Sequence, residues 1–436
     1  MKRRLLKGGR VVDPAQGIDG ECDVLVDGDR IARVGRDLPV DGAEVVEIPR
    51  GLVVCPGLID IHVHLREPGQ EHKETVASGT ASAVAGGFTA VACMPNTRPV
   101  NDDANVTGLI LAKAAAANLA RVYPIGALSR RQQGEQLADI AELKQAGCVA
   151  VTDDGHPTAT ALLMRRAMEY ARMFDLPIIE HCEEPTLFAG GVAHEGPSAS
   201  ALGLRGIPGA CEAMGVERGV LLAELTGAHF HVAHMSARQS LRAVRAGKAA
   251  GITVTCEVTP HHFTLTDELL GAPVPYDTNA KMNPPLRSTE DRDAMIAGLA
   301  DGSIDVIATD HAPHHYDEKN VEFDKAPFGI VGLETAVSLT FDRLVHAGHI
   351  TLPRMVELLS ANPARVLRLP GGTLAEGGPA DITILAPDLV TTVDPATMRS
   401  KGRNTPFAGW TLRGGVAATI VGGRTLYMNE SAGLRG

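Results

Sequence analysis

Histidine and aspartate side chains recur at defined places along this chain, and their spacing points to metal chemistry. The segment from 60 to 66 reads DIHVHLR. Side chains two residues apart on a strand point the same way, so His62 and His64 would face the same side and hold one metal ion through imidazole nitrogens. The alternative is a pair of surface histidines on an edge strand.

Four later apolar runs also end in ionisable or histidine residues. These runs end in VTDDG (151–155), IEHC (179–182), VAHMS (232–236) and ATDH (308–311). Such a set of histidines and carboxylates suits Zn²⁺. Because the set exceeds what one tetrahedral ion needs, we predict two ions that share a bridging carboxylate, from Asp153 or Asp154. The residues alone leave this choice and the metal count open.

Asp310 is the residue that we expect to transfer protons. A metal-activated hydroxide that attacks a carbonyl carbon needs a base, which takes its proton and hands it to the leaving nitrogen. The alternative role for Asp310 is capping a helix. Together these residues predict a metal-dependent hydrolase that cleaves an amide-type C–N bond.

A repeated strand and helix pattern must position these residues. From about residue 55 to 365, short apolar runs alternate with longer segments of helical periodicity. We expect eight strands, at residues 58–64, 89–94, 121–126, 148–152, 176–181, 229–234, 253–258 and 305–309. This number predicts an α/β fold, a (β/α)8 TIM-type barrel with its catalytic groups at the carboxyl ends of the strands.

The two ends of the chain follow a different pattern. Residues 23–31 alternate in polarity around an Asp-Gly turn, which is typical of an antiparallel hairpin, and the stretch from about 371 resembles them. Neither end has enough strands to be stable alone. We therefore predict a composite β-sandwich domain from residues 1–54 and 371–436, beside a barrel domain at 55–370.

Composition excludes several classes of protein. The net charge of −11, with 3% aromatic residues and no basic block, argues against nucleic-acid binding. No apolar run is long enough to span a bilayer, and the N-terminus does not have the pattern of a secretory signal. The seven cysteines lack CxxC spacing, so we expect reduced, packed thiols. These features favour a cytoplasmic enzyme.

Eight segments together resemble the dihydroorotase family, in its bacterial type I form, within the amidohydrolase superfamily. They are DIHVHLREPG (60–69), MPNTRP (94–99), TDDG (152–155), EHCE (180–183), AHMS (233–236), TNAKMNPPLR (278–287), ATDHAPHH (308–315) and KAPFGIVGLETA (325–336). The resemblance covers essentially the whole chain. It implies reversible hydrolysis and cyclisation between L-dihydroorotate and N-carbamoyl-L-aspartate, in pyrimidine biosynthesis.

The resemblance also implies roles for particular residues. The implied metal ligands are His62, His64, Asp154, His181, His234 and Asp310, with Asp154 bridging two Zn²⁺ ions. The implied substrate contacts are His64, Arg66, Asn96, Asn283, His314, Phe328 and Gly329. Arg66 offers a planar fork to a carboxylate, and the asparagines offer donors and acceptors to an imide edge. The alternatives are a surface salt bridge for the arginine and turn-forming side chains for the asparagines.

Other interpretations concern the substrate and the partners. Many superfamily members bridge their metals with a carbamylated lysine after the fourth strand, where this chain has none. A dihydropyrimidinase or an allantoinase would share the fold, but Arg66 favours a ring that bears a carboxylate. A scaffold that supports aspartate transcarbamoylase is a further alternative, and a homodimer is a family expectation. The long segment 313–329 predicts a substrate-contacting loop that orders on binding.

Overall fold

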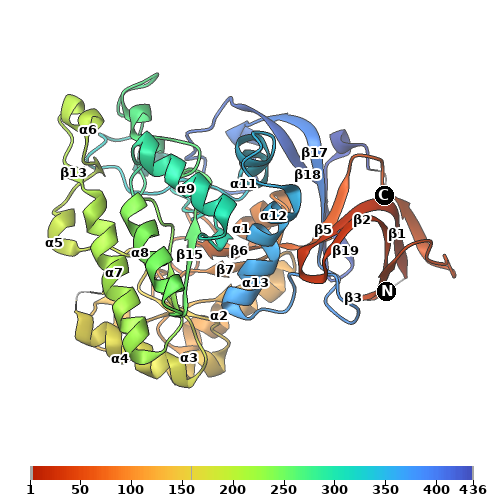
Figure 1. Ribbon diagram of the computed structural model, residues 1–436, viewed down its shortest axis with the longest axis horizontal. Helices are drawn as coiled ribbons and strands as arrows, with labels where there is room; N and C mark the ends of the chain where they lie inside the picture. The colour runs from red at the N-terminus through yellow and green to blue at the C-terminus, as the bar shows by residue number, and fades with distance from the viewer. Residues whose placement is uncertain (1–2, 159, 435–436) are drawn as a thin grey trace.

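The chain forms a parallel barrel with a sheet at one side (Figure 1), in a computed structural model that describes residues 3–158 and 160–434. Within these residues all eight expected barrel strands are present. They are β6 (Leu58–Val63), β7 (Phe88–Cys93), β8 (Arg121–Pro124) continued by β9 (Gly126–Ala127), β10 (Val151–Thr152), β11 (Ile178–Glu180), β14 (Phe230–Val232), β15 (Val254–Val258) and β16 (Val306–Ile307). The strands pair in parallel in this order, and a bridge between Val63 and His311 closes the ring. The predicted barrel is confirmed.

A helix follows each barrel strand and covers its outer side. In chain order the covering helices are α1 (Val76–Ala85), α2 (Ala104–Ala117), α3 (Ile140–Ala146), α4 (Ala161–Met173), α7 (Gly209–Thr226), α8 (Arg238–Ala249), α9 (Thr289–Asp301) and α11 (Ala336–Thr340). Local sequence sets their starts. For example, Thr75 and Ser78 cap the first turn of α1 reciprocally, which satisfies two backbone N–H groups. Further helices are α5 (Pro185–Phe188), α6 (Pro197–Leu202), α10 (Tyr316–Lys319), α12 (Leu352–Val356) and α13 (Asn362–Leu367).

Strands from both ends of the chain share one sheet beside the barrel. Its members are β1 (Arg4–Asp13), β2 (Ile18–Asp27), β3 (Arg30–Gly35), β4 (Glu44–Glu47), β5 (Val53–Pro56), β17 (Ile382–Thr392), β18 (Thr411–Val421) and β19 (Arg424–Met428). The two ends meet where β17 pairs with β5, at Ile384 opposite Val54. The predicted hairpin is β2 and β3, which pair antiparallel. The small β domain built from both ends is therefore confirmed, while the sandwich arrangement and the division at residues 54 and 371 stay predictions.

Apolar side chains fill the barrel and the layer between strands and helices. The barrel interior holds small and branched residues such as Ile61, Ala92 and Ile179. All seven cysteines are free and six are buried, as expected for packed thiols. Among the described residues, no helix has the length and apolar character needed to cross a membrane. The polar residues of interest lie above this core, at the carboxyl ends of the strands.

Candidate metal centre

The six predicted ligands meet at the carboxyl end of the barrel. They are His62 within β6, His64 just after it, Asp154 after β10, His181 after β11, His234 after β14 and Asp310 after β16. All six are buried, so the surface-histidine interpretation is wrong. The Asp154 carboxylate lies 3.5 Å from ring nitrogens of both His62 and His234.

Two groups of three side chains could each hold a metal ion, and both groups include Asp154. One group is His62, His64 and Asp154, and the other is Asp154, His181 and His234. Asp310 lies beside the first group, because its Oδ1 is 3.0 Å from Nε2 of His64. Two adjacent groups with one common carboxylate form the arrangement expected of a two-metal hydrolase.

The structure separates the two neighbouring aspartates that the sequence left as alternatives. Asp153 turns away from the cluster, where its carboxylate accepts hydrogen bonds from the backbone N–H groups of Leu128 and Ser129, each at 2.9 Å. Asp154 points among the imidazoles instead. Of the two aspartates, Asp154 is therefore the one whose carboxylate lies among the candidate ligands.

Unpartnered atoms show that the residues fit a bound cation. Within the described residues, Nε2 of His62 and Oδ1 of Asp154 are buried without a hydrogen-bond partner, although they are 3.5 Å apart. Buried polar atoms without partners are rare, and a metal ion would satisfy both. The donor set of imidazoles and carboxylates is the one that Zn²⁺ prefers.

A buried glutamate that the sequence analysis missed fixes the orientation of His62. Glu257, on β15, accepts a hydrogen bond of 2.6 Å from Nδ1 of His62, which leaves Nε2 free toward the cluster. The other oxygen of Glu257 accepts from His231 at 3.2 Å, and Thr255 contacts His231 in turn. A carboxylate behind a ligating histidine sets its tautomer and raises its basicity. The available signal was a single carboxylate inside the apolar run of β15.

The charges of the cluster reinforce one another. Burial opposes the charged form of His62, but Glu257 and Asp154 outweigh it and raise the pKa of His62 well above its ordinary value. Burial likewise opposes ionisation of Asp310, but His62 and His64 outweigh it and lower the pKa of Asp310 to about 2. The same carboxylate charges that favour protonated rings also favour a bound cation.

A cavity of about 190 Å³ opens onto this cluster and gathers the predicted substrate contacts. Its walls include every predicted site residue except His62, together with Gly155 and Ala312. Asn96 accepts a hydrogen bond from Nδ1 of His64 at 2.9 Å, and Asn283 donates to Glu183 at 3.0 Å. Both asparagines therefore also support residues beside the site.

Arg66 is buried in the wall of this cavity without a carboxylate to neutralise it. Its Nε donates to the carbonyl of Pro313 at 3.3 Å, and it has no ion-pair partner among the described residues. Burial lowers the pKa of Arg66 to about 10, against the attraction of Asp310 and Asp154. The surface salt bridge considered for this residue is therefore wrong. A buried, unpaired guanidinium is costly unless an anionic ligand pairs with it.

Backbone strain coincides with the site. Arg66, His234 and Asp310 are not glycines, yet their φ angles are +61°, +29° and +48°. Residues in this left-handed region cost free energy and cluster at functional sites, where the surrounding structure holds them in place. The strain here aims three of the predicted side chains into one cavity.

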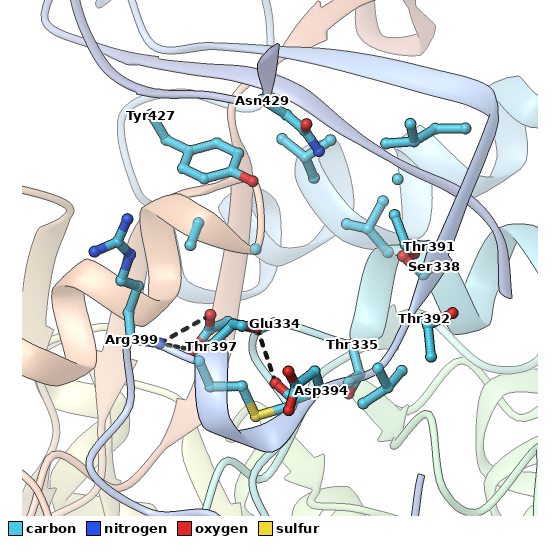
Figure 2. Close-up of a pocket in the computed structure, with 18 residues that line it drawn as sticks. Glu334, Thr335, Ser338, Thr391, Thr392, Asp394, Thr397, Arg399, Tyr427 and Asn429 are labelled. Carbon is cyan, nitrogen blue, oxygen red and sulfur yellow. Dashed lines mark hydrogen bonds between the residues drawn. The ribbon is translucent and has the colours of Figure 1, made fainter. Parts of the chain in front are cut away.

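A second cavity, of about 300 Å³, lies between the barrel and the sheet (Figure 2). Its described lining residues include Glu334, Arg399 and Tyr427 but no histidine. Glu334 is satisfied there by the backbone N–H groups of Arg399 and Ser400. The second cavity therefore lacks the metal-ligating residues of the first.

The barrel and its buried cluster of histidines and aspartates are typical of barrel hydrolases that use metal ions. Solved structures agree on the fold: an L-hydantoinase (dihydropyrimidinase) from Arthrobacter aurescens matches with a TM-score of 0.88 at 24% identity, covering 98% of this chain and 96% of that one. A dihydropyrimidinase from Brevibacillus agri matches with a TM-score of 0.82 at 22% identity, covering 98% and 95%.

Sequence comparison places the chain within that class. A family profile described as Dihydro-orotase-like matches residues 51–240. A protein named Dihydroorotase from Syntrophotalea carbinolica is 55% identical over 97% of this chain and 98% of its own length. One of the same name from Geobacter metallireducens is 50% identical over 97% and 99%. The chain belongs to the dihydroorotase family.

Proposed function

We propose that this chain interconverts L-dihydroorotate and N-carbamoyl-L-aspartate, in de novo pyrimidine biosynthesis. The observation that carries the proposal is the 190 Å³ cavity, whose wall combines the metal-ligating cluster with the unpaired Arg66. Hydrolysis of the ring needs the metal-ligating cluster, and recognition of the ring carboxylate needs Arg66. The names and extents of the relatives support the same reaction.

Asp310 is the proposed general acid and base. In the hydrolytic direction, water adds its oxygen to the ring carbonyl carbon, Asp310 takes the proton, and the ring C–N bond breaks as Asp310 returns the proton to nitrogen. His62 and His64 lower the pKa of Asp310 to about 2 against the effect of burial, so its carboxylate is ionised at neutral pH. Cyclisation reverses these steps, with loss of water.

Arg66 and the two asparagines are proposed to orient the ring. Arg66 lines the cavity and its guanidinium has no carboxylate partner among the described residues, so it can pair with the substrate carboxylate. Asn96 and Asn283 line the same cavity and can hydrogen-bond the imide edge. His314, Phe328 and Gly329 complete the wall beside Arg66.

The residues would hold two Zn²⁺ ions, bridged by Asp154. When bound, such ions polarise a carbonyl group and lower the pKa of water, which supplies the nucleophile at neutral pH. His62 and His64 would serve one ion with Asp310, and His181 and His234 would serve the other. Metal analysis of the purified protein, before and after chelation, tests both the identity and the count.

Turnover of L-dihydroorotate by metal-replete protein tests the function directly, beside dihydrouracil and allantoin as controls. We expect activity on dihydroorotate alone, lost on chelation and restored by Zn²⁺. Activity on the uncharged rings instead would favour a dihydropyrimidinase or an allantoinase. No activity on any ring, despite bound metal, would favour the scaffold interpretation.

The proposal also covers the cellular location of the enzyme, its oligomeric state and a partner protein. We place it in the cytoplasm as a homodimer that is able to associate with aspartate transcarbamoylase. Co-elution of the two purified proteins tests the association, and separate elution at high concentration would contradict it.

A further inference from the structure

Glu183 is a buried carboxylate beside the metal centre to which the proposed reaction gives no part. It follows the candidate ligand His181 by two residues and is 7% exposed. Its Oε2 lies 3.5 Å from Nε2 of His181 and accepts a hydrogen bond of 3.0 Å from Nδ2 of Asn283. One carboxylate oxygen therefore contacts both a candidate metal ligand and a proposed substrate contact.

The ring of His181 is turned the opposite way from other rings of the centre. His62 and His234 present Nε2 to the shared aspartate, whereas His181 presents Nδ1, which is 2.9 Å from Nε2 of His234. For Nδ1 to bind a cation, the proton of the neutral ring must be on Nε2. The acceptor for this proton is Glu183, because the other atom near Nε2 is the NH2 group of Asn283, which is itself a donor.

The same carboxylate decides which end of the Asn283 amide faces the cavity. An ionised carboxylate only accepts hydrogen bonds, so the amide atom 3.0 Å from Glu183 must be the NH2 group. Oδ1 of Asn283 has no hydrogen-bond partner among the described residues and is left for a ligand in the cavity. Asn96 is fixed in the opposite sense, because its Oδ1 accepts from Nδ1 of His64. The two amides thus present one acceptor and one donor to the substrate.

The backbone is held on both sides of the contact between Glu183 and Asn283. On one side α7 packs closely, because a Cβ atom at Gly215 would lie only 2.8 Å from the backbone nitrogen of Glu183. On the other side, Nε2 of His262 donates to the carbonyl of Pro284 at 3.0 Å, next to Asn283. Neither segment can shift freely to replace a lost side-chain contact.

We propose that Glu183 is a positioning residue, which fixes the tautomer of His181 and the amide orientation of Asn283. The inference rests on the proposed function, because it gives Glu183 a part in that same site. Since Asn283 offers its oxygen to the substrate, the site selects a ring with an N–H group at that position. A ring with a carbonyl oxygen there would face an acceptor with an acceptor, which a site built from buried polar groups rejects.

Metal affinity tests the role of Glu183 toward His181. In competition with a chromogenic chelator, Glu183→Gln should weaken Zn²⁺ binding about 10- to 100-fold, as loss of a carboxylate behind a ligating histidine typically does. Glu184→Gln is the matched control, because the side chain of Glu184 accepts hydrogen bonds from Thr186 at the start of α5. The control should bind Zn²⁺ as the wild type does. Equal affinities in the wild type and Glu183→Gln would overturn the orienting role.

Exchanging the two partners tests the role of Glu183 toward Asn283. Asn283→Asp places two carboxylates 3.0 Å apart, so it should raise KM for dihydroorotate about tenfold or more. Adding Glu183→Gln should recover most of this loss, because the introduced amide can donate to the introduced carboxylate. That carboxylate can also accept from Nε2 of His181 and still offer an oxygen to the substrate. A double variant with a KM no lower than that of Asn283→Asp would overturn the proposal.

The same variants test the contact without turnover. The urea midpoint of the metal-free protein should fall in Asn283→Asp and recover in the double variant, since the repulsion is then replaced by a hydrogen bond. A midpoint that falls further in the double variant would contradict the contact. An inactive wild type would contradict the proposed function instead, because the chelator and urea measurements would still decide the role of Glu183.

Discussion

Asp310 combines three properties at the scale of a single residue: a strained backbone, burial among imidazoles and a depressed pKa. Its carboxylate is 3.0 Å from His64 and 3.5 Å from His62, in the wall of the cavity that we propose to hold the substrate. No other carboxylate among the described lining residues is free for this role, because Asp154 lies at the shared position of both metal groups.

We therefore predict that Asp310→Asn lowers kcat by about 10² to 10⁴, the range for loss of general acid and base catalysis. The measurement is steady-state turnover of dihydroorotate, with metal content determined on the same sample. If the variant retained its metal and turned over at the wild-type rate, the acid and base assignment would be wrong.

Glu257 acts through His62 and not on the substrate. We predict that Glu257→Gln weakens metal binding about 10- to 100-fold, as loss of such a supporting carboxylate typically does. Competition with a chromogenic chelator measures this without any need for activity. Asp305→Asn is the control, because Asp305 is a buried carboxylate that binds Lys248 at the far end of the neighbouring strand. Equal metal affinity in wild type and Glu257→Gln would contradict the orienting role.

The sequence predicted which residues gather at the site better than it predicted what supports them. The ends of parallel strands must meet, so His62, His181 and His234 could be placed together from their positions alone. Glu257 could not, because a carboxylate within an apolar strand gives no indication of what it contacts across the barrel. The choice between Asp153 and Asp154 needed side-chain directions, which only the structure supplies.

At the scale of elements, the segment 313–329 depends on a residue far away in the sequence. Asn404, 4% exposed, accepts a hydrogen bond from the backbone of His314 and donates to the carbonyls of Ala312 and Gly329, all at 3.0 Å. It thus joins both ends of the predicted substrate loop. No local pattern could reveal this contact, because 90 residues separate Asn404 from His314.

Asn404→Ala is therefore expected to raise KM for dihydroorotate about tenfold, since each lost hydrogen bond at a buried group costs about 1 to 3 kcal/mol. Metal content should not change, because Asn404 does not contact the cluster. Asn105→Ala, at an exposed position of α2, is the matched control. An unchanged KM in Asn404→Ala would show that the loop holds its position without this residue.

Two buried lysines hold the same loop from inside. Nζ of Lys319 donates to the carbonyls of Lys281 and Pro327, and Nζ of Lys281 donates to those of Phe323 and Asp324. Burial lowers the pKa of Lys319 to about 7 and that of Lys281 to about 8. Between these values and the ordinary lysine pKa of 10.5, the unfolded chain binds more protons than the folded chain.

The stability contribution of Lys319 is therefore fully present above pH 10.5 and is lost as the pH falls through about 7. Urea unfolding at pH 7 and pH 9 should show a rise in stability that Lys319→Met reduces by about 2 kcal/mol. Lys325→Met is the control, because Lys325 is in the same loop but 71% exposed. The free energy of unfolding of this control variant should rise between pH 7 and pH 9 as much as that of the wild type. Identical rises in wild type and Lys319→Met would contradict a lowered pKa.

At the scale of the whole molecule, barrel and sheet are joined by the returning chain. The periodicity of the sequence predicted both parts, and the pairing of the ends followed from the instability of either alone. How the sheet attaches to the barrel could not be predicted in full, because some of the contacts join residues as far apart in the sequence as the 260 positions between Arg121 and Asp381. Arg121, at the start of β8, and Asp381, just before β17, form a pair at 2.6 Å and 3.1 Å that spans this junction.

Asp381 is 6% exposed and also accepts from the backbone of Gly422, so its loss would leave several donors without an acceptor. Arg121 is 38% exposed, so solvent screens part of its attraction to Asp381. We therefore expect Asp381→Ala to lower the free energy of unfolding by about 2 kcal/mol, which is less than the cost of breaking a fully buried ion pair. Asp388→Ala, which breaks the exposed pair with Arg413, should leave the urea midpoint nearly unchanged. If the sheet and the barrel form one cooperative unit, the Asp381 variant should show a single transition at lower urea. A separate early transition would mean that this pair holds together two parts that otherwise unfold independently.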